Sequence, residues 1–420
     1  MVTKITACLA LSVMLLACVG VSPKKETDWA SSMDRYKVVL DAPPTKVPST
    51  KTPDGALAGN GDLGITLGGT PDSLSLYIGK NDFWMAYPVY PGGIASPGGL
   101  DLWIPCLKGA DYHVEQLPGS AEIRGRFTQG DTCLEMSAWV AALRNWIVIE
   151  LEANREVEVS FRLWATSGGV SINDSGSEPV TWVSRSFADS PSLRWPSHIA
   201  MAVGLPGVER SGLSPIMLQP GTKRRMVVTA YTNHDTGRWK ERAIDEAKNL
   251  TADALREARK EHRDWWQSFW RESSVQIPDE ELQRLYYMSQ YLFACSSRSG
   301  KFAPGIWGPF VTCDNAAWGG DYHLNYNYQA PYWASYSSNH IHLTDNFDQP
   351  LLDYMESGRK HAKELLGCRG IYYPVGIGPN GLCTSMWPFT PEEMMEKYAT
   401  TENTIDGGYK FLGQKINAVF

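Results

Sequence analysis

The chain has 420 residues, 43% of them hydrophobic, and a formal net charge of −7. This length suggests two domains, or one large domain with an appendage, and the composition is sufficient for a sizeable core. A negative net charge without any basic run argues against a nucleic-acid-binding protein, which needs a concentrated positive face.

The first 18 residues have the features of a lipoprotein signal peptide. Lys4 supplies a short basic region, and the apolar stretch 5–16 is too short to span a bilayer. It runs into Leu15-Leu16-Ala17-Cys18, which resembles the lipobox of bacterial lipoproteins, so we expect acylation of Cys18. Ordinary secretion is the alternative. Residues 19–34 are a polar tether, and we expect an exported protein anchored by lipid to a membrane, in the periplasm or at the cell surface.

Six cysteines follow the leader, and none forms a CxxC pair that would suggest zinc or redox chemistry. We interpret them mainly as small buried hydrophobic residues: Cys106, Cys133, Cys295, Cys313, Cys368 and Cys383. The chain also has 16 tryptophans and 19 tyrosines. Many such rings belong to a core, but indole and phenol rings also stack on sugar faces.

Residues 35–240 alternate with period two, which predicts a β-sandwich domain. Leu63, Ile65 and Leu67 alternate with small or polar neighbours, and residues 157–163 alternate apolar with polar side chains. Residues 145–151 are nearly all apolar, which is typical of a strand covered on both faces. Gly- and Pro-rich turns separate these segments, so we expect a large antiparallel sandwich.

Residues 241–275 change to the period of a helix and are predicted to link two domains. Thr251 is the expected N-cap, and one face carries apolar residues at spacings of three and four. We expect its Trp-rich end, 265–270, to pack between the domains. A second helix starts after Pro278, with acidic residues in its first turn. Its predicted buried stripe consists of Leu282, Leu285, Tyr286, Ser289, Leu292, Phe293 and Ser296.

The densest group of polar and aromatic residues is the run 314–333. It contains two carboxylates, a histidine, several amides and several rings, which would be costly to bury without partners. A cleft that hydrogen-bonds hydroxyl groups and stacks rings on a sugar explains this mixture better than a structural role. A metal site at Asp314, Asp321 and His323 is the alternative, but no HExxH motif is present. We predict no metal and no cofactor.

The segment Asp321-Tyr322-His323-Leu324-Asn325-Tyr326-Asn327-Tyr328-Gln329 and its flanks, 318–333, resemble the inverting α-L-fucosidases of glycoside hydrolase family 95. A second match, Leu57-Ala58-Gly59-Asn60-Gly61-Asp62-Leu63-Gly64, resembles the start of the β-supersandwich that precedes their (α/α)6 six-hairpin barrel. The resemblance covers roughly residues 35–420. It implies an α+β multidomain fold, with the sandwich followed by a linker helix and a barrel, and an oligosaccharide or polysaccharide substrate.

The resemblance also implies roles for individual residues. Two family asparagines that hold the nucleophilic water match Asn325 and Asn327. A carboxamide is not a base, so a carboxylate must take the proton, and inversion needs a general acid on the opposite side of the sugar. In the family these carboxylates come from later in the barrel. We expect substrate contacts from the neighbouring residues Asp314, Asp321, His323, Gln329 and Trp333.

Twelve barrel helices need about 300 residues at ordinary helix and loop lengths, and only about 150 residues follow the linker helix. Residues 276–420 are therefore predicted to form an incomplete catalytic barrel, and the chain to be an inactive fragment whose acid and base lie beyond residue 420. A non-catalytic surface glycan-binding lipoprotein is the second hypothesis. A polysaccharide lyase is the third, although the run 314–333 lacks the Arg or Lys that an acidic glycan would require.

Overall fold

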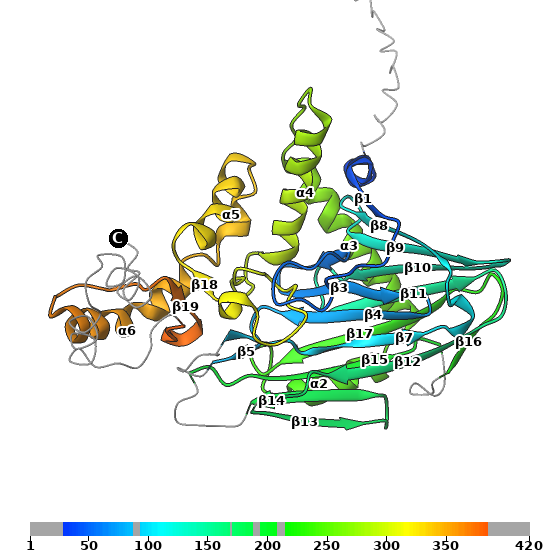
Figure 1. The fold of residues 1–420 in the computed structure, drawn as a ribbon, viewed down its shortest axis with the longest axis horizontal. Coiled ribbons are helices and arrows are strands. Elements are labelled where there is room, and N and C mark those ends of the chain that lie inside the picture. Colours follow the sequence, from blue (N-terminus) through cyan, green and yellow to red (C-terminus); the bar gives the residue numbers. More distant parts are fainter. Residues whose placement is uncertain (1–27, 87–92, 169, 188–193, 208–214, 385–420) are drawn as a thin grey trace, which may run out of the picture.

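The structure is a computed structural model that describes residues 28–86, 93–168, 170–187, 194–207 and 215–384. The predicted leader and Cys18 lie outside the described residues. An antiparallel β-sandwich forms first, and most helices follow it in sequence, with the last ones beyond one end of the sandwich (Figure 1). The predicted fold class, a β-sandwich followed by helices, is confirmed for this part of the chain.

The larger sheet has nine antiparallel strands. Their spatial order is β1 (Val38–Leu40), β8 (Asp111–Leu117), β9 (Glu122–Gln129), β10 (Thr132–Val140), β11 (Trp146–Ala153), β17 (Arg224–Thr232), β15 (His198–Gly204), β14 (Trp182–Phe187) and β13 (Ser171–Gly176). The apolar run predicted at 145–151 is the central strand β11, whose residues 146–149 are all buried.

The smaller sheet has six strands in the order β16 (Ile216–Leu218), β12 (Val157–Ala165), β7 (Gly98–Trp103), β4 (Ser73–Lys80), β3 (Leu63–Thr70) and β2 (Leu57–Gly59). Two further two-stranded sheets pair β5 (Trp84–Met85) with β6 (Gly93–Ile94), and β18 (Tyr322–His323) with β19 (Gly376–Ile377). Each residue pairing in these sheets is antiparallel, as the alternating pattern predicted.

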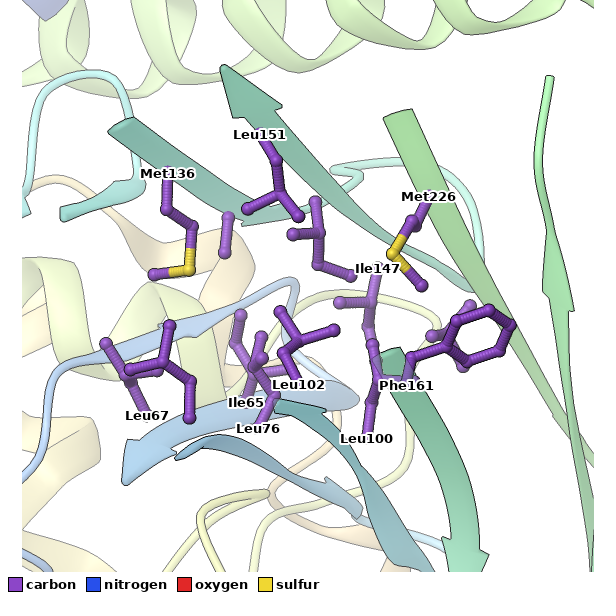
Figure 2. Packing of buried hydrophobic residues seen from close by; sticks show 14 of the residues in the cluster. Ile65, Leu67, Leu76, Leu100, Leu102, Met136, Ile147, Leu151, Phe161 and Met226 are labelled. Carbon is purple, nitrogen blue, oxygen red and sulfur yellow. The ribbon is translucent and has the colours of Figure 1, made fainter. Parts of the chain in front are cut away.

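The main core lies between the two sheets (Figure 2). Ile65, Leu76 and Leu102 of the smaller sheet face Met136 and Leu151 of the larger one, and all five are at most 2% exposed. Successive side chains of a strand point to opposite faces, so the period-two pattern places one apolar set inward on each sheet.

Two helices, not one, connect the sandwich to the rest of the chain. They are α2 (Trp239–Lys248) and α3 (Ala252–Glu272), and the Thr251 hydroxyl caps α3 by accepting a bond from the Ala254 N–H at 3.1 Å. Leu255 and Ala258 of α3 pack on the outer face of the nine-stranded sheet. The Trp-rich end packs against α4 (Glu280–Ser296) and the short helix α1 (Trp29–Met33), as expected.

Helix α4 begins after Pro278, as predicted, with Asp279 as its N-cap, but its predicted buried face is wrong. Leu282 and Leu285 are 54% and 57% exposed, whereas Tyr287 and Tyr291 are buried against α3 and the sandwich. The helix has two apolar faces, and the one that carries Tyr287 and Tyr291 contacts α3 and the sandwich. The C-terminal part of the predicted stripe, from Ser289 to Ser296, instead lines a pocket together with α5 (Tyr326–Ser337). The last long helix is α6 (Gln349–Leu366).

The cysteine interpretation is correct only for Cys295, which is buried. Cys106 and Cys368 are exposed, the remaining three are half-buried, and none of the six forms a disulfide. Within the described ranges, every helix is too short or too polar to traverse a bilayer.

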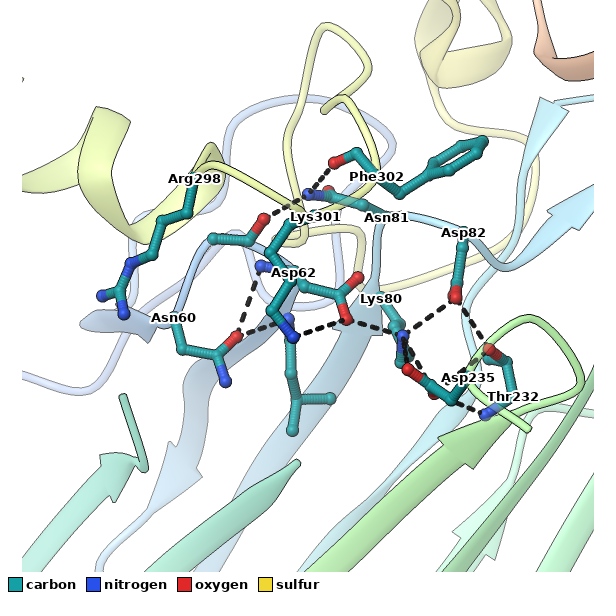
Figure 3. A network of polar contacts seen from close by, with 12 residues as sticks. Asn60, Asp62, Lys80, Asn81, Asp82, Thr232, Asp235, Arg298, Lys301 and Phe302 are labelled. Carbon is teal, nitrogen blue, oxygen red and sulfur yellow. Dashed lines mark hydrogen bonds and ion pairs between the residues drawn. The ribbon is translucent and has the colours of Figure 1, made fainter. Parts of the chain in front are cut away.

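A buried polar network joins the two parts of the fold (Figure 3). The Lys80 ammonium lies 2.6 Å from Asp62, 2.9 Å from Asp82 and 3.2 Å from Asp235. Beside it, Asn81 donates to the carbonyl of Ser296 at the end of α4, at 2.8 Å. The network therefore fixes α4 relative to the sandwich.

Asn60 holds the turn between β2 and β3. Its side-chain oxygen accepts from the Leu63 N–H at 2.9 Å, and its amide donates to the carbonyls of Ala141 and Arg144. Gly61 follows with φ 88°, and a Cβ there would lie 2.3 Å from the Arg298 side chain. The second family-like motif is thus a compact turn against the C-terminal end of α4.

Candidate functional site

Two loops from the helical part are hydrogen-bonded to each other and form the base of the candidate site. The Ile306 N–H donates to the Asp321 carbonyl at 2.9 Å, and the Trp307 indole N–H donates to the Ala317 carbonyl at 2.9 Å. Gly305 passes so close to the second loop that a Cβ would lie 2.0 Å from the Gly320 carbonyl oxygen. Only glycine fits there, so the loops hold one arrangement.

The second loop is also attached to the sandwich. Thr312 exchanges hydrogen bonds with the backbone of Ser49, at 2.8 and 3.1 Å, and the Ala317 N–H donates to the Thr50 carbonyl at 2.6 Å. These contacts connect the loop to a segment about 260 residues earlier in the chain. The sandwich therefore positions the run that the sequence singled out.

Asp314 is the strongest of these attachments. Both of its oxygens accept from the buried guanidinium of Arg185 on β14, at 2.8 and 2.6 Å, and Oδ1 also accepts from the Ser96 N–H at 3.1 Å. In this arrangement Asp314 anchors the loop, because paired N–H donors satisfy the carboxylate on both sides. Its predicted contact with substrate stays a prediction.

Asn325 and Asn327 lie together at the start of α5. Asn325 is the N-cap, and its side-chain oxygen accepts from the Asn327 N–H at 3.4 Å, while its own side chain is exposed. Pro331 stands one turn after Asn327 and has no N–H, so it cannot donate to the Asn327 carbonyl as a helical residue would. The start of α5 therefore carries one exposed carboxamide (Asn325), one half-buried carboxamide (Asn327) and one carbonyl without its usual helical donor.

Asn327 and Pro331 line a pocket of about 370 Å³. Its other walls are α4, the loop 304–308, and Thr52 and Pro53 of the sandwich segment. The lining is mostly apolar and includes Leu292 and Phe293 from the face of α4 that the sequence predicted to be buried. Among the described residues that line it there is no Asp or Glu. The Asn327 carboxamide can orient a water molecule or a hydroxyl group there, but it cannot take a proton.

Asp321 and His323 form a second polar group at the two-stranded sheet of β18 and β19. His323 Nδ1 lies 3.0 Å from Asp321 Oδ1, and the Thr384 hydroxyl donates to the other oxygen. Burial raises the pKa of Asp321, while the bonds from His323 and Thr384 act in the opposite direction. The carboxylate fixes the orientation of the imidazole, which lies two residues before Asn325.

The remaining two predicted residues are placed differently. Gln329 donates to the Leu324 carbonyl at 2.9 Å and so braces the turn that enters α5. Trp333 is 53% exposed and packs edge-to-face against Tyr326. Neither lines the pocket that contains Asn327. Their predicted substrate contacts stay predictions, and within the described ranges no cluster of His, Cys, Asp and Glu is suited to hold a metal ion.

The sequence analysis did not single out Trp307 and Trp318 as site residues. Their rings are parallel within 7°, with centroids 6.1 Å apart, and Trp318 also stacks on His323 at 5.4 Å. Trp318 lies inside the run that the sequence marked, so composition could have indicated it. Thr52 and Pro53 gave no local signal, because only the tertiary fold brings them to the pocket.

The helical part of the chain is similar to a known protein family. Residues 247–399 match the family model described as the Glycosyl hydrolase family 95 catalytic domain. The match includes both asparagines, the run 314–333 and helices α3 to α6. The resemblance to this glycoside hydrolase family, which the sequence predicted, is confirmed for that part of the chain.

Two similar curated proteins are both named probable alpha-fucosidase A. That of Aspergillus niger (strain ATCC MYA-4892 / CBS 513.88 / FGSC A1513) is 38% identical over 71 residues, which are 17% of this chain and 8% of the relative. That of Aspergillus oryzae (strain ATCC 42149 / RIB 40) is 33% identical over 94 residues, 22% of this chain and 13% of the relative. The chain thus matches only a small share of each relative's length.

A solved structure described as a putative kojibiose phosphorylase from human microbiome has the same fold over most of the chain. The superposition has a TM-score of 0.57 at 11% sequence identity, and it covers 90% of this chain and 56% of that protein. At this identity the likeness concerns the fold alone, and it includes both the sandwich and the helices.

Proposed function

We propose that this chain belongs to an enzyme that hydrolyses glycosidic bonds, and that it acts on α-L-fucosides with inversion of configuration. The observation that carries the proposal is the Asn-x-Asn pair at the start of α5, within the region similar to the family 95 catalytic domain. The names of the two Aspergillus relatives support fucose as the sugar.

In the proposed mechanism, Asn325 and Asn327 hold the attacking water by its hydrogen bonds. Carboxamides orient and polarise this water, and a carboxylate outside the described pocket lining takes its proton. Inverting enzymes separate acid and base by roughly 6.5–9.5 Å, which leaves room for water between base and sugar. His323 is oriented by Asp321 and lies two residues before Asn325 in the sequence. Its imidazole is suited to bind a sugar hydroxyl.

The test uses the purified full-length enzyme that contains this chain, with an aryl α-L-fucoside and with a fucosylated oligosaccharide, and follows the products by proton NMR. We expect β-L-fucose as the first product. Asn325→Ala and Asn327→Ala should each lower kcat by about 100-fold or more with little change in KM, because the water is positioned for the transition state. Asn173→Ala, on the exposed strand β13, is the control. An α-anomer as first product contradicts inversion, and full turnover in both variants contradicts the water-holding role.

A second candidate function is binding of glycans without cleavage. The pocket lining favours it, since the described residues around Asn327 include no carboxylate. Calorimetric titration of the chain with fucosylated oligosaccharides, beside the NMR assay, separates the two candidates. Binding that leaves the glycan intact for many hours supports the second, whereas release of fucose supports the first.

We also propose that the protein is exported and carries acyl chains on Cys18. The basic Lys4, the apolar stretch 5–16 and the lipobox-like Leu15-Leu16-Ala17-Cys18 support this. Detergent phase partitioning in a bacterial host tests it. The parent should enter the detergent phase, and Cys18→Ser should remain in the aqueous phase. Equal partitioning of both proteins would favour plain secretion.

A further inference from the structure

Trp318 combines two unfavourable features in one residue. Its side chain is 57% exposed, and its backbone lies in the left-handed region, with φ 55° and ψ 29°. A bulky residue with positive φ is uncommon. An exposed indole leaves a large apolar area in water, where it does not contribute to stability. Residues held in such conformations cluster at ligand-binding sites, where the surrounding structure maintains them.

The structure around Trp318 maintains this conformation firmly. Residues that precede it are attached to the sandwich, through the pair Arg185–Asp314 and the bond from Ala317 to Thr50. Gly320 packs on β6, where a Cβ would lie 2.2 Å from the Ile94 side chain. The indole is therefore presented from a rigid loop, and little entropy is lost when a ligand covers it.

The exposed indole is continuous with the pocket of the proposed active site. Trp307 lines the pocket that contains Asn327, and its ring is parallel to that of Trp318. Trp318 also stacks on His323, which precedes Asn325 by two residues. The aromatic row Trp307, Trp318 and His323 thus runs from the pocket wall along the entrance to α5.

We propose that Trp318 is a stacking platform for a second sugar unit, next to the unit held at Asn325 and Asn327. The ligand is an oligosaccharide whose second pyranose ring places its C–H face on the indole. A flat, rigid aromatic surface offers apolar contact, and the neighbouring imidazole of His323 offers a hydrogen-bonding group for a hydroxyl. This inference rests on the proposed function and specifies that the substrate is larger than a monosaccharide.

The test measures binding, so that it does not depend on cleavage. The full chain and its Trp318→Ala and Trp318→Phe variants are titrated by calorimetry with L-fucose and with a fucosylated trisaccharide. Trp318→Ala should weaken trisaccharide binding about tenfold, a value typical of a lost aromatic contact, and leave L-fucose binding within about twofold. Trp318→Phe keeps an aromatic ring, so its affinity for the trisaccharide should lie between those of the parent and of Trp318→Ala.

A second readout locates the contact. In a spectrum of the protein with ¹⁵N-labelled indoles, the Trp318 signal is the one missing from Trp318→Phe, and it should shift with the trisaccharide but not with L-fucose. Tyr336→Ala, which removes another ring that is 57% exposed on α5, is the matched control and should leave both affinities unchanged.

Each outcome decides the proposal. Unchanged trisaccharide affinity in Trp318→Ala, or an equal loss for both ligands, overturns it while the proposed function stands. If Trp318→Ala does not fold, Trp318→Phe and the indole shift still decide. If the parent chain binds neither ligand, the proposed function and this inference fail together.

Discussion

The guanidinium of Arg185 and the carboxylate of Asp314 form a two-point ion pair across 129 residues of sequence. Arg185 is completely buried, and the side chain of Asp314 is 19% exposed. Removal of one partner from such a pair leaves an uncompensated charge inside the protein. The pair is therefore a direct link between the sandwich and the loop that carries Trp318.

Asp314→Asn should lower the free energy of unfolding by about 3 kcal/mol, because Arg185 then loses its buried counter-ion. Urea unfolding of the two proteins at neutral pH measures this. Asp131→Asn is the control, since it breaks a pair with Arg155 whose side chains are 82% and 57% exposed, and it should have no measurable effect. Equal stability of Asp314→Asn and the parent would contradict the anchoring role.

Asn60→Ala should destabilise the protein by about 3 kcal/mol, because two buried backbone carbonyls and the Leu63 N–H lose their partner. The same substitution at Asn173, whose amide bonds Thr166 at the surface, should change little. Thermal unfolding followed by circular dichroism compares them. If Asn60→Ala matches the control, the turn does not depend on this side chain.

Lys80→Met should lower the free energy of unfolding further, by about 3–5 kcal/mol, because the buried carboxylates of Asp62 and Asp82 and the partly exposed one of Asp235 would then repel one another without a cation. Lys260→Met is the control. It removes an exposed lysine that pairs with Asp264 on α3, and it should leave the free energy of unfolding unchanged. Urea unfolding again provides the measurement. A fully stable Lys80→Met would mean that the carboxylates are neutral in the folded protein.

The free energy of unfolding should depend on pH because of the titration of Asp82. Burial raises its pKa to about 7 from 3.8, with Asp62 and Asp235 acting in the same direction and Lys80 opposing them. Between these two values the folded state binds more protons than the unfolded state. The Asp82 contribution to stability therefore falls as pH rises through this window, by up to about 1.4 kcal/mol per pH unit.

Asp82→Asn cannot titrate at this position, so the parent should lose stability relative to the variant between about pH 4 and 7. Subtraction of the two unfolding profiles removes the contributions of other groups. These include His234 and His262, whose pKa values burial lowers to about 4 and about 3 and whose effects run the other way. A flat difference would show that Asp82 is ionised throughout.

Local patterns in the sequence predicted most of the fold. Period two located β3 and β12, and a nearly continuous apolar run located β11. The cap Thr251 located the start of α3, and Pro278 with the acidic residues after it located the start of α4. The inner face of α4 was predicted wrongly, because this helix has apolar residues on two sides and periodicity alone does not say which side meets the sandwich.

The candidate site was predictable only where its residues are neighbours in sequence. Asn325, Asn327, Asp321 and His323 lie within seven positions, so their density revealed them. Arg185 gave no such signal, because its partner lies 129 residues away and only the completed sheet brings β14 to the loop.

The pocket wall formed by Thr52 and Pro53 has a consequence for how specificity can change in this protein. The region similar to the catalytic domain begins at residue 247, so this part of the wall is encoded nearly 200 residues before it. A chimera that received only the helical region of a relative would keep this native wall opposite the imported Asn327. Sugar preference in such hybrids should therefore follow both parents, and exchange of residues 49–53 alone should shift it.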